Sequence, residues 1–170
     1  MEVLEELNQK TFLWIELGLQ TSNEITASLI NRGYDNDLFE KTIRNLKDRG
    51  IKIVIHLIGG LPGEYKETFI ESVKYVNHLS PWGIKFHSIY IQDNSPLLGY
   101  SLKNNFEPLG MYEYIDWVTD ALLLLDNKII IHRVTGDPDK KKLVTPNWQK
   151  NKLKVISEIK RVLKEKGKPG

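Results

Sequence analysis

The chain has 170 residues, of which 41% are hydrophobic and 27% charged, and its formal net charge at pH 7 is +2. This length suits one domain with its own core, and a charge so near neutral does not by itself indicate nucleic-acid or membrane binding. The sequence contains no cysteine, which excludes disulfides and thiolate metal sites, and its opening MEVLEELNQK lacks the pattern of a secretory signal. No apolar run reaches the ~20 residues of a membrane span, so we expect a cytoplasmic protein with no membrane partner.

Hydrophobic periodicity and turn residues predict helices that alternate with strands along the chain. In the first half we expect a helix over 2–9, a strand over 12–19, a helix from Ser22 or Asn23 to Gly33, a helix over 37–49 and a strand over 51–58. In the second half we expect a helix over 68–79, a strand over 84–91, a loop over 92–110, a helix over 111–125, a strand over 129–133, a loop over 135–150 and a helix over 152–166. Such alternation implies parallel βαβ units and an α/β fold.

Polar or glycine-rich turns follow the first two expected strands. Gln20 and Ser22 come where the first strand ends, and Gly59 and Gly60 come where the second ends. Parallel α/β folds bind their ligands at the carboxyl ends of strands. The sequence therefore predicts a binding site built from two successive strand ends.

Three motifs carry a family resemblance: ELGLQTS at 16–22, NRGY at 31–34 and HLIGGLPGE at 56–64. Together they resemble the second half of a radical S-adenosylmethionine (SAM) barrel, and the likeness covers residues 7–163. It is nearest to a family of small bacterial radical-SAM proteins of poorly defined function. Oxygen-independent coproporphyrinogen oxidase and the Elongator catalytic subunit are more distant likenesses. The resemblance implies one domain over 1–170: the C-terminal half of a TIM-like (β/α)6 barrel, with parallel strands and flanking helices, plus a C-terminal extension.

The resemblance also implies two cofactors, SAM and a [4Fe–4S] cluster. Members of this family hold the cluster on three cysteines of a CxxxCxxC loop, and this chain has no cysteine. We therefore expect a C-terminal fragment, inactive alone, whose partner is the missing cluster-bearing half of the same barrel. The whole enzyme would cleave SAM reductively, with tRNA among the substrates left open by the Elongator likeness. Two alternatives stay open: a SAM- or nucleotide-binding module without radical chemistry, and a non-catalytic scaffold that pairs with another chain.

The likeness assigns cofactor-binding roles to residues near the strand ends. Gln20 and Ser22 would meet the ribose or amino-acid part of SAM, although a helix cap with a surface amide explains them equally simply. Arg32 would hold the SAM carboxylate with its planar guanidinium, the alternative being a solvated arginine near a helix end. Ile58, Gly59 and Gly60 would lie against adenosine, or form a turn needed only for geometry.

Further along the chain the same likeness places Ile89 and Tyr90 at the adenine, through their backbone. His56 would face the barrel cavity, unless it is a satisfied core histidine. Glu16 is a charge inside an apolar strand, where it points inward to a ligand, pairs with an arginine or lies at an exposed end.

Two features concern partners rather than the cofactor. The basic and hydroxyl groups of 132–137 suit an anionic substrate or a solvated loop. The strand over 12–19 would become an apolar edge in this chain, so we expect self-association through that edge or the opened barrel interior. The sequence identifies no catalytic residue and no metal ligand.

Overall fold

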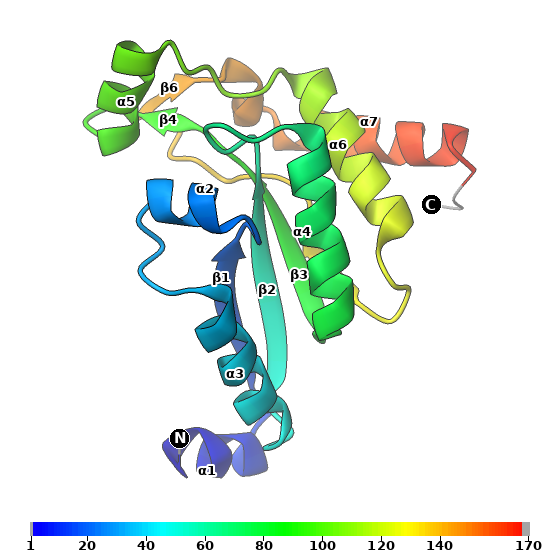
Figure 1. Cartoon of the computed structure of the whole chain (residues 1–170). Coiled ribbons are helices and arrows are strands. Elements are labelled where there is room, and N and C mark those ends of the chain that lie inside the picture. The colour runs from blue at the N-terminus through cyan, green and yellow to red at the C-terminus, as the bar shows by residue number, and fades with distance from the viewer. Residues whose placement is uncertain (1, 168–170) are drawn as a thin grey trace.

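The structure, a computed structural model, describes residues 2–167. Four parallel strands form its main sheet in the order β1-β2-β3-β5: Trp14–Gln20, Lys52–Gly59, Gly83–Ser88 and Ile130–Arg133. The helices are α1 Glu2–Lys10, α2 Glu24–Leu29, α3 Asn36–Lys47, α4 Lys66–Leu79, α5 Pro96–Asn104, α6 Met111–Leu124 and α7 Lys152–Glu165 (Figure 1). The expected parallel α/β sheet with flanking helices is confirmed.

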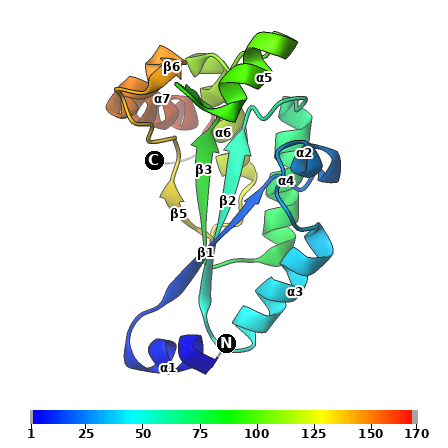
Figure 2. The ribbon, with the colours of Figure 1, turned by 90° about the vertical axis from the view of Figure 1, so that its left-hand side faces the viewer.

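One face of the sheet, which we call the outer face, is buried under helices. Alternate residues of β2, such as Ile53, Ile55 and Leu57, are at most 1% exposed and pack in one core with α3, α4 and α6. Figure 2 shows α3 and α4 on one side of the sheet, while among the described residues no helix covers β1 and β2 on the other side. This second side is the inner face, and it carries the polar side chains of the strands.

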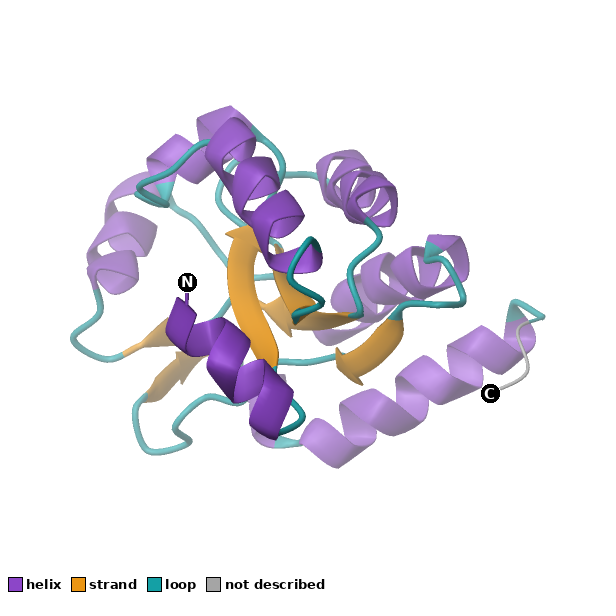
Figure 3. Cartoon of the chain, turned by 90° about the horizontal axis from the view of Figure 1, so that it is seen from below, coloured by secondary structure: helices purple, strands orange, loops and turns teal. Residues whose placement is uncertain are grey.

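The lower end of the sheet is closed by α1. Figure 3, a view from below, shows α1 nearest the viewer and across the end of the strands. An ion pair of 2.7 Å joins Arg49, just before β2, to Glu5 of α1. Loops surround the opposite end, where the strands finish, and this is the end at which parallel α/β folds bind ligands.

Four expected elements differ in the structure. The strand expected over 84–91 ends at Ser88: the N–H of Ile89 makes a last hydrogen bond to Gly59 O of β2 (3.0 Å), and the chain then leaves the sheet. The next residues form β4, Ile91–Gln92, which pairs antiparallel with β6, Leu143–Thr145, inside the expected loop over 135–150. A short 3₁₀ helix over Asn147–Lys150 follows in the same stretch.

The loop expected over 92–110 contains α5. Ser95 caps this helix by accepting a hydrogen bond from Leu98 N, and Pro96 stands in the first turn, where its missing N–H does no harm. The helix expected to reach Gly33 ends earlier, at Leu29, since Asn31 already takes a left-handed φ of 55°. None of the described helices is long and apolar enough to cross a lipid bilayer.

Candidate binding site at the strand ends

A pocket of about 660 Å³ opens at the carboxyl ends of β1 and β2. Four of the residues singled out in the sequence line it: Gln20, Arg32, Ile58 and Ile89. Apolar walls come from the turn after β2 and from the segment that leads into α5, by way of Leu61, Pro62, Pro96 and Leu97. We call this cavity the strand-end pocket. The prediction that successive strand ends meet at one site agrees with this arrangement.

Gln20 reaches the pocket through an irregularity in β1. Its φ is 65°, and the pairing of β1 with β2 shifts register between Gly18 and Gln20. The amide nitrogen of Gln20 folds back over Gly18, where an added Cβ would lie only 2.3 Å from it. A glycine at position 18 is thus what allows the Gln20 side chain to occupy this place.

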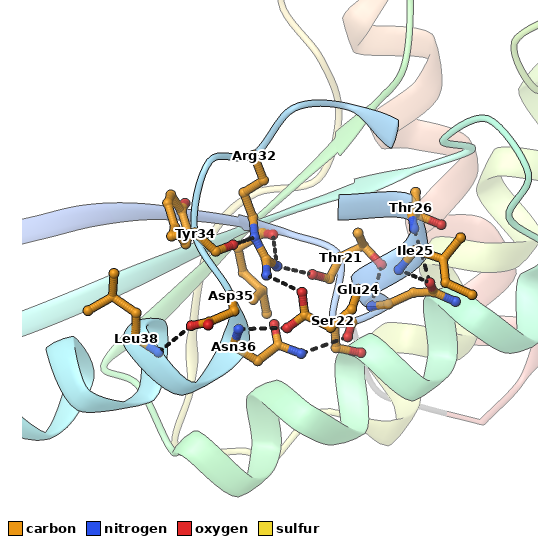
Figure 4. Close-up of polar contacts among 12 residues, drawn as sticks. Thr21, Ser22, Glu24, Ile25, Thr26, Arg32, Tyr34, Asp35, Asn36 and Leu38 are labelled. Carbon is orange, nitrogen blue, oxygen red and sulfur yellow. Dashed lines mark hydrogen bonds and ion pairs between the residues drawn. The ribbon is translucent and has the colours of Figure 1, made fainter. Parts of the chain in front are cut away.

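Arg32 is buried, with its side chain 2% exposed, and most of its donors are used within the chain (Figure 4). Nη1 donates to Leu19 O at 3.2 Å and to Thr21 O at 2.8 Å. Nε donates to Tyr34 O at 2.8 Å, and Nη2 pairs with Glu24 at 3.1 Å. Four of the five guanidinium N–H groups therefore hold the segment after β1 against the loop before α3. Its predicted contact with the SAM carboxylate stays a prediction, with one N–H left for it.

Ser22 faces away from the pocket, toward α4. Its N–H donates to Ser72 Oγ at 2.9 Å, and the two hydroxyls lie 3.1 Å apart. The neighbouring Thr21 hydroxyl donates to Glu64 Oε1 at 2.5 Å. Burial raises the pKa of Glu64, against the opposing effect of this hydrogen bond. The second oxygen of Glu64 is buried and has no hydrogen-bond partner among the described residues. None of these four side chains lines the pocket. Glu64 closes the HLIGGLPGE motif, whereas sequence reasoning missed Ser72.

The turn after β2 is shaped by close packing. Gly60 has a φ of 82°, and a Cβ there would lie 2.7 Å from Leu109 Cγ. The Gly59 carbonyl accepts from Ile89 N, and the Ile89 carbonyl accepts from Gln149 Nε2 at 2.9 Å. Backbone groups that the resemblance assigns to the nucleoside thus already make hydrogen bonds within the chain. A carbonyl has a second lone pair that can accept from a ligand, and the adenine contact at Ile89 stays a prediction.

His56 lies on the inner face rather than in the strand-end pocket. Glu16 accepts hydrogen bonds from Lys85 Nζ at 2.6 Å to both oxygens, and His56 Nε2 lies 3.0 Å from Glu16 Oε2. The hydrogen bond from Lys85 holds the pKa of Glu16 down at about 2. Burial lowers the pKa of His56, against the attraction of Glu16. Glu16 therefore points to the inner face and has a lysine and a histidine as partners, rather than the arginine that was one of the three alternatives.

Tyr90 is half-buried and packs beside Gly136, where an added Cβ would lie 3.4 Å from its ring. It does not line the strand-end pocket. Among the described residues, no group of three or more His, Cys, Asp or Glu side chains is placed to hold a metal ion.

Comparison with known proteins agrees with the motifs. Residues 1–76 match the model of the Radical SAM superfamily, and residues 81–165 match the model of the Radical_SAM C-terminal domain. The chain is 36% identical over 167 residues to YtqA of Bacillus subtilis, which covers 98% of this chain and 52% of that protein. The chain thus spans about half the length of the curated relatives it matches.

The two more distant likenesses are found as well. Oxygen-independent coproporphyrinogen III oxidase of Salmonella typhimurium is 30% identical over 82 residues, 48% of this chain and 18% of that enzyme. A tRNA uridine(34) acetyltransferase of Methanocaldococcus infernus is 24% identical over 139 residues, 78% of this chain and 26% of that enzyme.

The fold has a solved counterpart in Elp3 of Methanocaldococcus infernus with an N-terminal deletion. The TM-score is 0.82 at 20% identity, over 98% of this chain and 39% of that one. Because the identity is so low, this likeness supports the fold alone, and it agrees with the parallel sheet described above. The two family models and the similarity to YtqA carry the assignment of the sequence. The chain belongs to the radical SAM superfamily.

Proposed function

We propose that this chain supplies the SAM- and substrate-binding strand ends of a radical-SAM enzyme. Members of this superfamily use SAM together with a [4Fe–4S] cluster. The observation that carries the proposal is the strand-end pocket, which gathers Gln20, Ile58 and Ile89 from the ends of successive strands. Its volume lies within the ~300–1,000 Å³ of small-molecule sites.

The pocket residues fit SAM in chemistry. Ile58 and Ile89 offer apolar surface for an adenine ring, and the Gln20 amide can both donate to and accept from a ribose or amino-acid group. The remaining Nη2 hydrogen of Arg32 is available to a carboxylate. These residues bind and orient the ligand and keep water from one side of it.

The cluster does not fit this chain. Its sulfur ligands are cysteine thiolates, and the sequence has none. We propose that the cluster is held by an upstream half of the same barrel, which would pair with this chain along β1. The match to about half of YtqA supports this division. Phe12 and Trp14, 58% and 40% exposed, pack against Trp82 on the inner face, and the opened barrel interior would be covered by such a partner or by a second copy of the chain.

For the substrate we propose tRNA. The support is the likeness to a relative whose name states an action on tRNA uridine. An RNA-binding assay with the assembled enzyme tests this, using unmodified tRNA against a duplex DNA of equal charge. Tighter binding of tRNA is the expected result, and equal binding would count against it.

The test of the SAM site is calorimetry with a pocket variant and a matched control. We expect SAM to bind weakly to this chain and tightly to the chain joined to its cluster-bearing half. Ile58→Glu places a carboxylate in the pocket and should abolish binding, while Ile25→Glu, at a site 83% exposed, should leave it unchanged. Binding without deoxyadenosine formation would favour a SAM-binding module. Binding by neither form would favour a scaffold.

A further inference from the structure

A second cavity lies between the end of β5 and the start of α7. Its volume is about 290 Å³, near the small end of ligand sites. The polar side chains that line it are His132, Arg133, Thr135 and Lys152. It shares no lining residue with the strand-end pocket, so the SAM site does not account for it.

The polar groups of this cavity are not satisfied within the chain. Among residues 2–167, neither the Arg133 guanidinium nor the Thr135 hydroxyl has a hydrogen-bond or ion-pair partner, although Thr135 is only 1% exposed. Lys152 has one carboxylate nearby, Asp137 at 3.4 Å, and both side chains are well exposed, which makes that pair weak. A half-buried guanidinium without a partner, beside a buried His132 Nε2 that also has none among the described residues, indicates that a ligand supplies partners here.

The surroundings of the cavity are positive. In the sheet, Arg133 is the register partner of Lys85, which is itself the partner of His56. The carboxylate of Glu16 is taken by Lys85 and His56, which leaves Arg133 uncompensated. The pKa of His87 is lowered to about 4, first by burial and then by the nearby positive charges of His56 and Arg133. The positive end of α7, which begins at Lys152, adds to the same field.

We propose that this cavity binds a phosphate group, held by the Arg133 guanidinium, the Thr135 hydroxyl and the Lys152 ammonium. A guanidinium fork matches two phosphate oxygens, and the hydroxyl and ammonium donate to the others. The phosphate belongs to the backbone of an RNA substrate or to a small phosphorylated molecule. Only the RNA source depends on the proposed tRNA substrate; the phosphate site itself does not.

The first test titrates inorganic phosphate into the full 170-residue chain, followed by calorimetry and by the histidine Cε1–H signals in NMR. Saturable binding should raise the pKa of His87, because the anion offsets the charge of Arg133, while exposed His78 should not respond. Arg133→Gln should weaken phosphate binding about tenfold or more, since a charged hydrogen bond is lost.

Two further variants decide whether the site is specific. Thr135→Val keeps the shape and removes the hydroxyl, so it should weaken phosphate binding several-fold with the fold intact by circular dichroism. Arg161→Gln removes a positive charge from the exposed face of α7 and should leave the affinity for phosphate unchanged. No saturable binding, or equal weakening by Arg133→Gln and Arg161→Gln, would overturn the proposal.

A second arm identifies the source of the phosphate. A short single-stranded oligoribonucleotide that binds in an Arg133-dependent manner, and is displaced by inorganic phosphate, would assign the site to RNA. Binding of inorganic phosphate without such RNA binding would assign it to a small phosphorylated molecule. Either result supports the phosphate site, and SAM binding in the strand-end pocket remains a separate measurement.

Discussion

Arg32 acts as a clamp on the segment between β1 and α3, since its guanidinium donates to three backbone carbonyls and one carboxylate. We expect Arg32→Lys to lower the free energy of unfolding by about 1.5–3 kcal/mol, because a lysine cannot reproduce the planar fork and leaves acceptors unpaired. Urea denaturation measures this. Arg44→Lys, on a side chain 66% exposed, is the control and should change little. Equal midpoints for the two variants would contradict the clamp.

The same substitution separates the structural role of Arg32 from its predicted role toward SAM. If its free N–H holds the SAM carboxylate in the assembled enzyme, Arg32→Lys should weaken SAM binding by about one to two orders of magnitude. Calorimetry without urea, at a temperature where both proteins are fully folded, checks this. A loss of stability with unchanged SAM affinity would leave Arg32 as a structural residue only.

Glu16 predicts a specific response to acid. Its folded pKa, about 2, lies below its ordinary value of 4.5 because of Lys85, so its ionised form stabilises the fold above pH 4.5. That contribution is lost as the pH falls from 4.5 through about 2. Glu16→Gln should therefore be less stable than wild type at neutral pH, and the difference should vanish near pH 2. Urea midpoints across this pH range test it, with exposed Glu71→Gln as control. A constant difference would argue against the assigned shift.

Sequence reasoning at this scale found which residues reach the strand ends, but not what they contact. Gln20 ends β1 and Arg32 follows it, both in motifs that the family shares, so their place was predictable. The turn of Ser22 toward α4 depends on Ser72, fifty positions later in the sequence, and no local pattern reveals that pairing. The inner-face link from Glu16 to Lys85 likewise spans three strands whose register only the fold sets.

At the scale of elements, the turn after β2 gives a matched pair of glycines. Gly60 and Gly63 have φ values of 82° and 79°, but only Gly60 has neighbours at an added Cβ, with Leu109 Cγ at 2.7 Å. We expect Gly63→Ala to cost about 1–2 kcal/mol from backbone strain alone. Gly60→Ala should cost about 1–3 kcal/mol more, since Leu109 must move. Thermal unfolding compares the two variants, and equal losses would show that Leu109 yields freely.

The long elements were predictable because their periodicity is strong, whereas α5, β4 and β6 were missed. The strands β1 and β2 are nearly continuous apolar runs, and α3 repeats its buried residues Phe39, Ile43 and Leu46 at helical spacing. The helix α5 has no buried residue, so its sequence shows no apolar stripe, and only its cap at Ser95 and Pro96 could have indicated it. The strands β4 and β6 are held by their pairing with each other, and a strand of two or three residues is too short to show an alternating hydrophobic pattern.

At the scale of the molecule, the exposed edge of β1 predicts association. We expect the mass of the isolated chain in light scattering to rise with concentration, because β1 has one unpaired edge and Phe12 and Trp14 expose aromatic surface on the open inner face. Phe12→Lys should shift the chain toward monomer, since a charge at that position opposes burial of the inner face against a partner. Leu153→Lys, at a site 80% exposed on α7, is the control. A monodisperse wild-type monomer at high concentration would count against the edge.

The boundary between the two family models, after residue 76 and before residue 81, falls at the end of α4. The hydrogen bonds of the sheet cross it, because β2 pairs along its length with β3. The hydrophobic core crosses it too, because α4 and α6 pack together. The two matched segments thus share one sheet and one hydrophobic core, and a cut at that point would divide both.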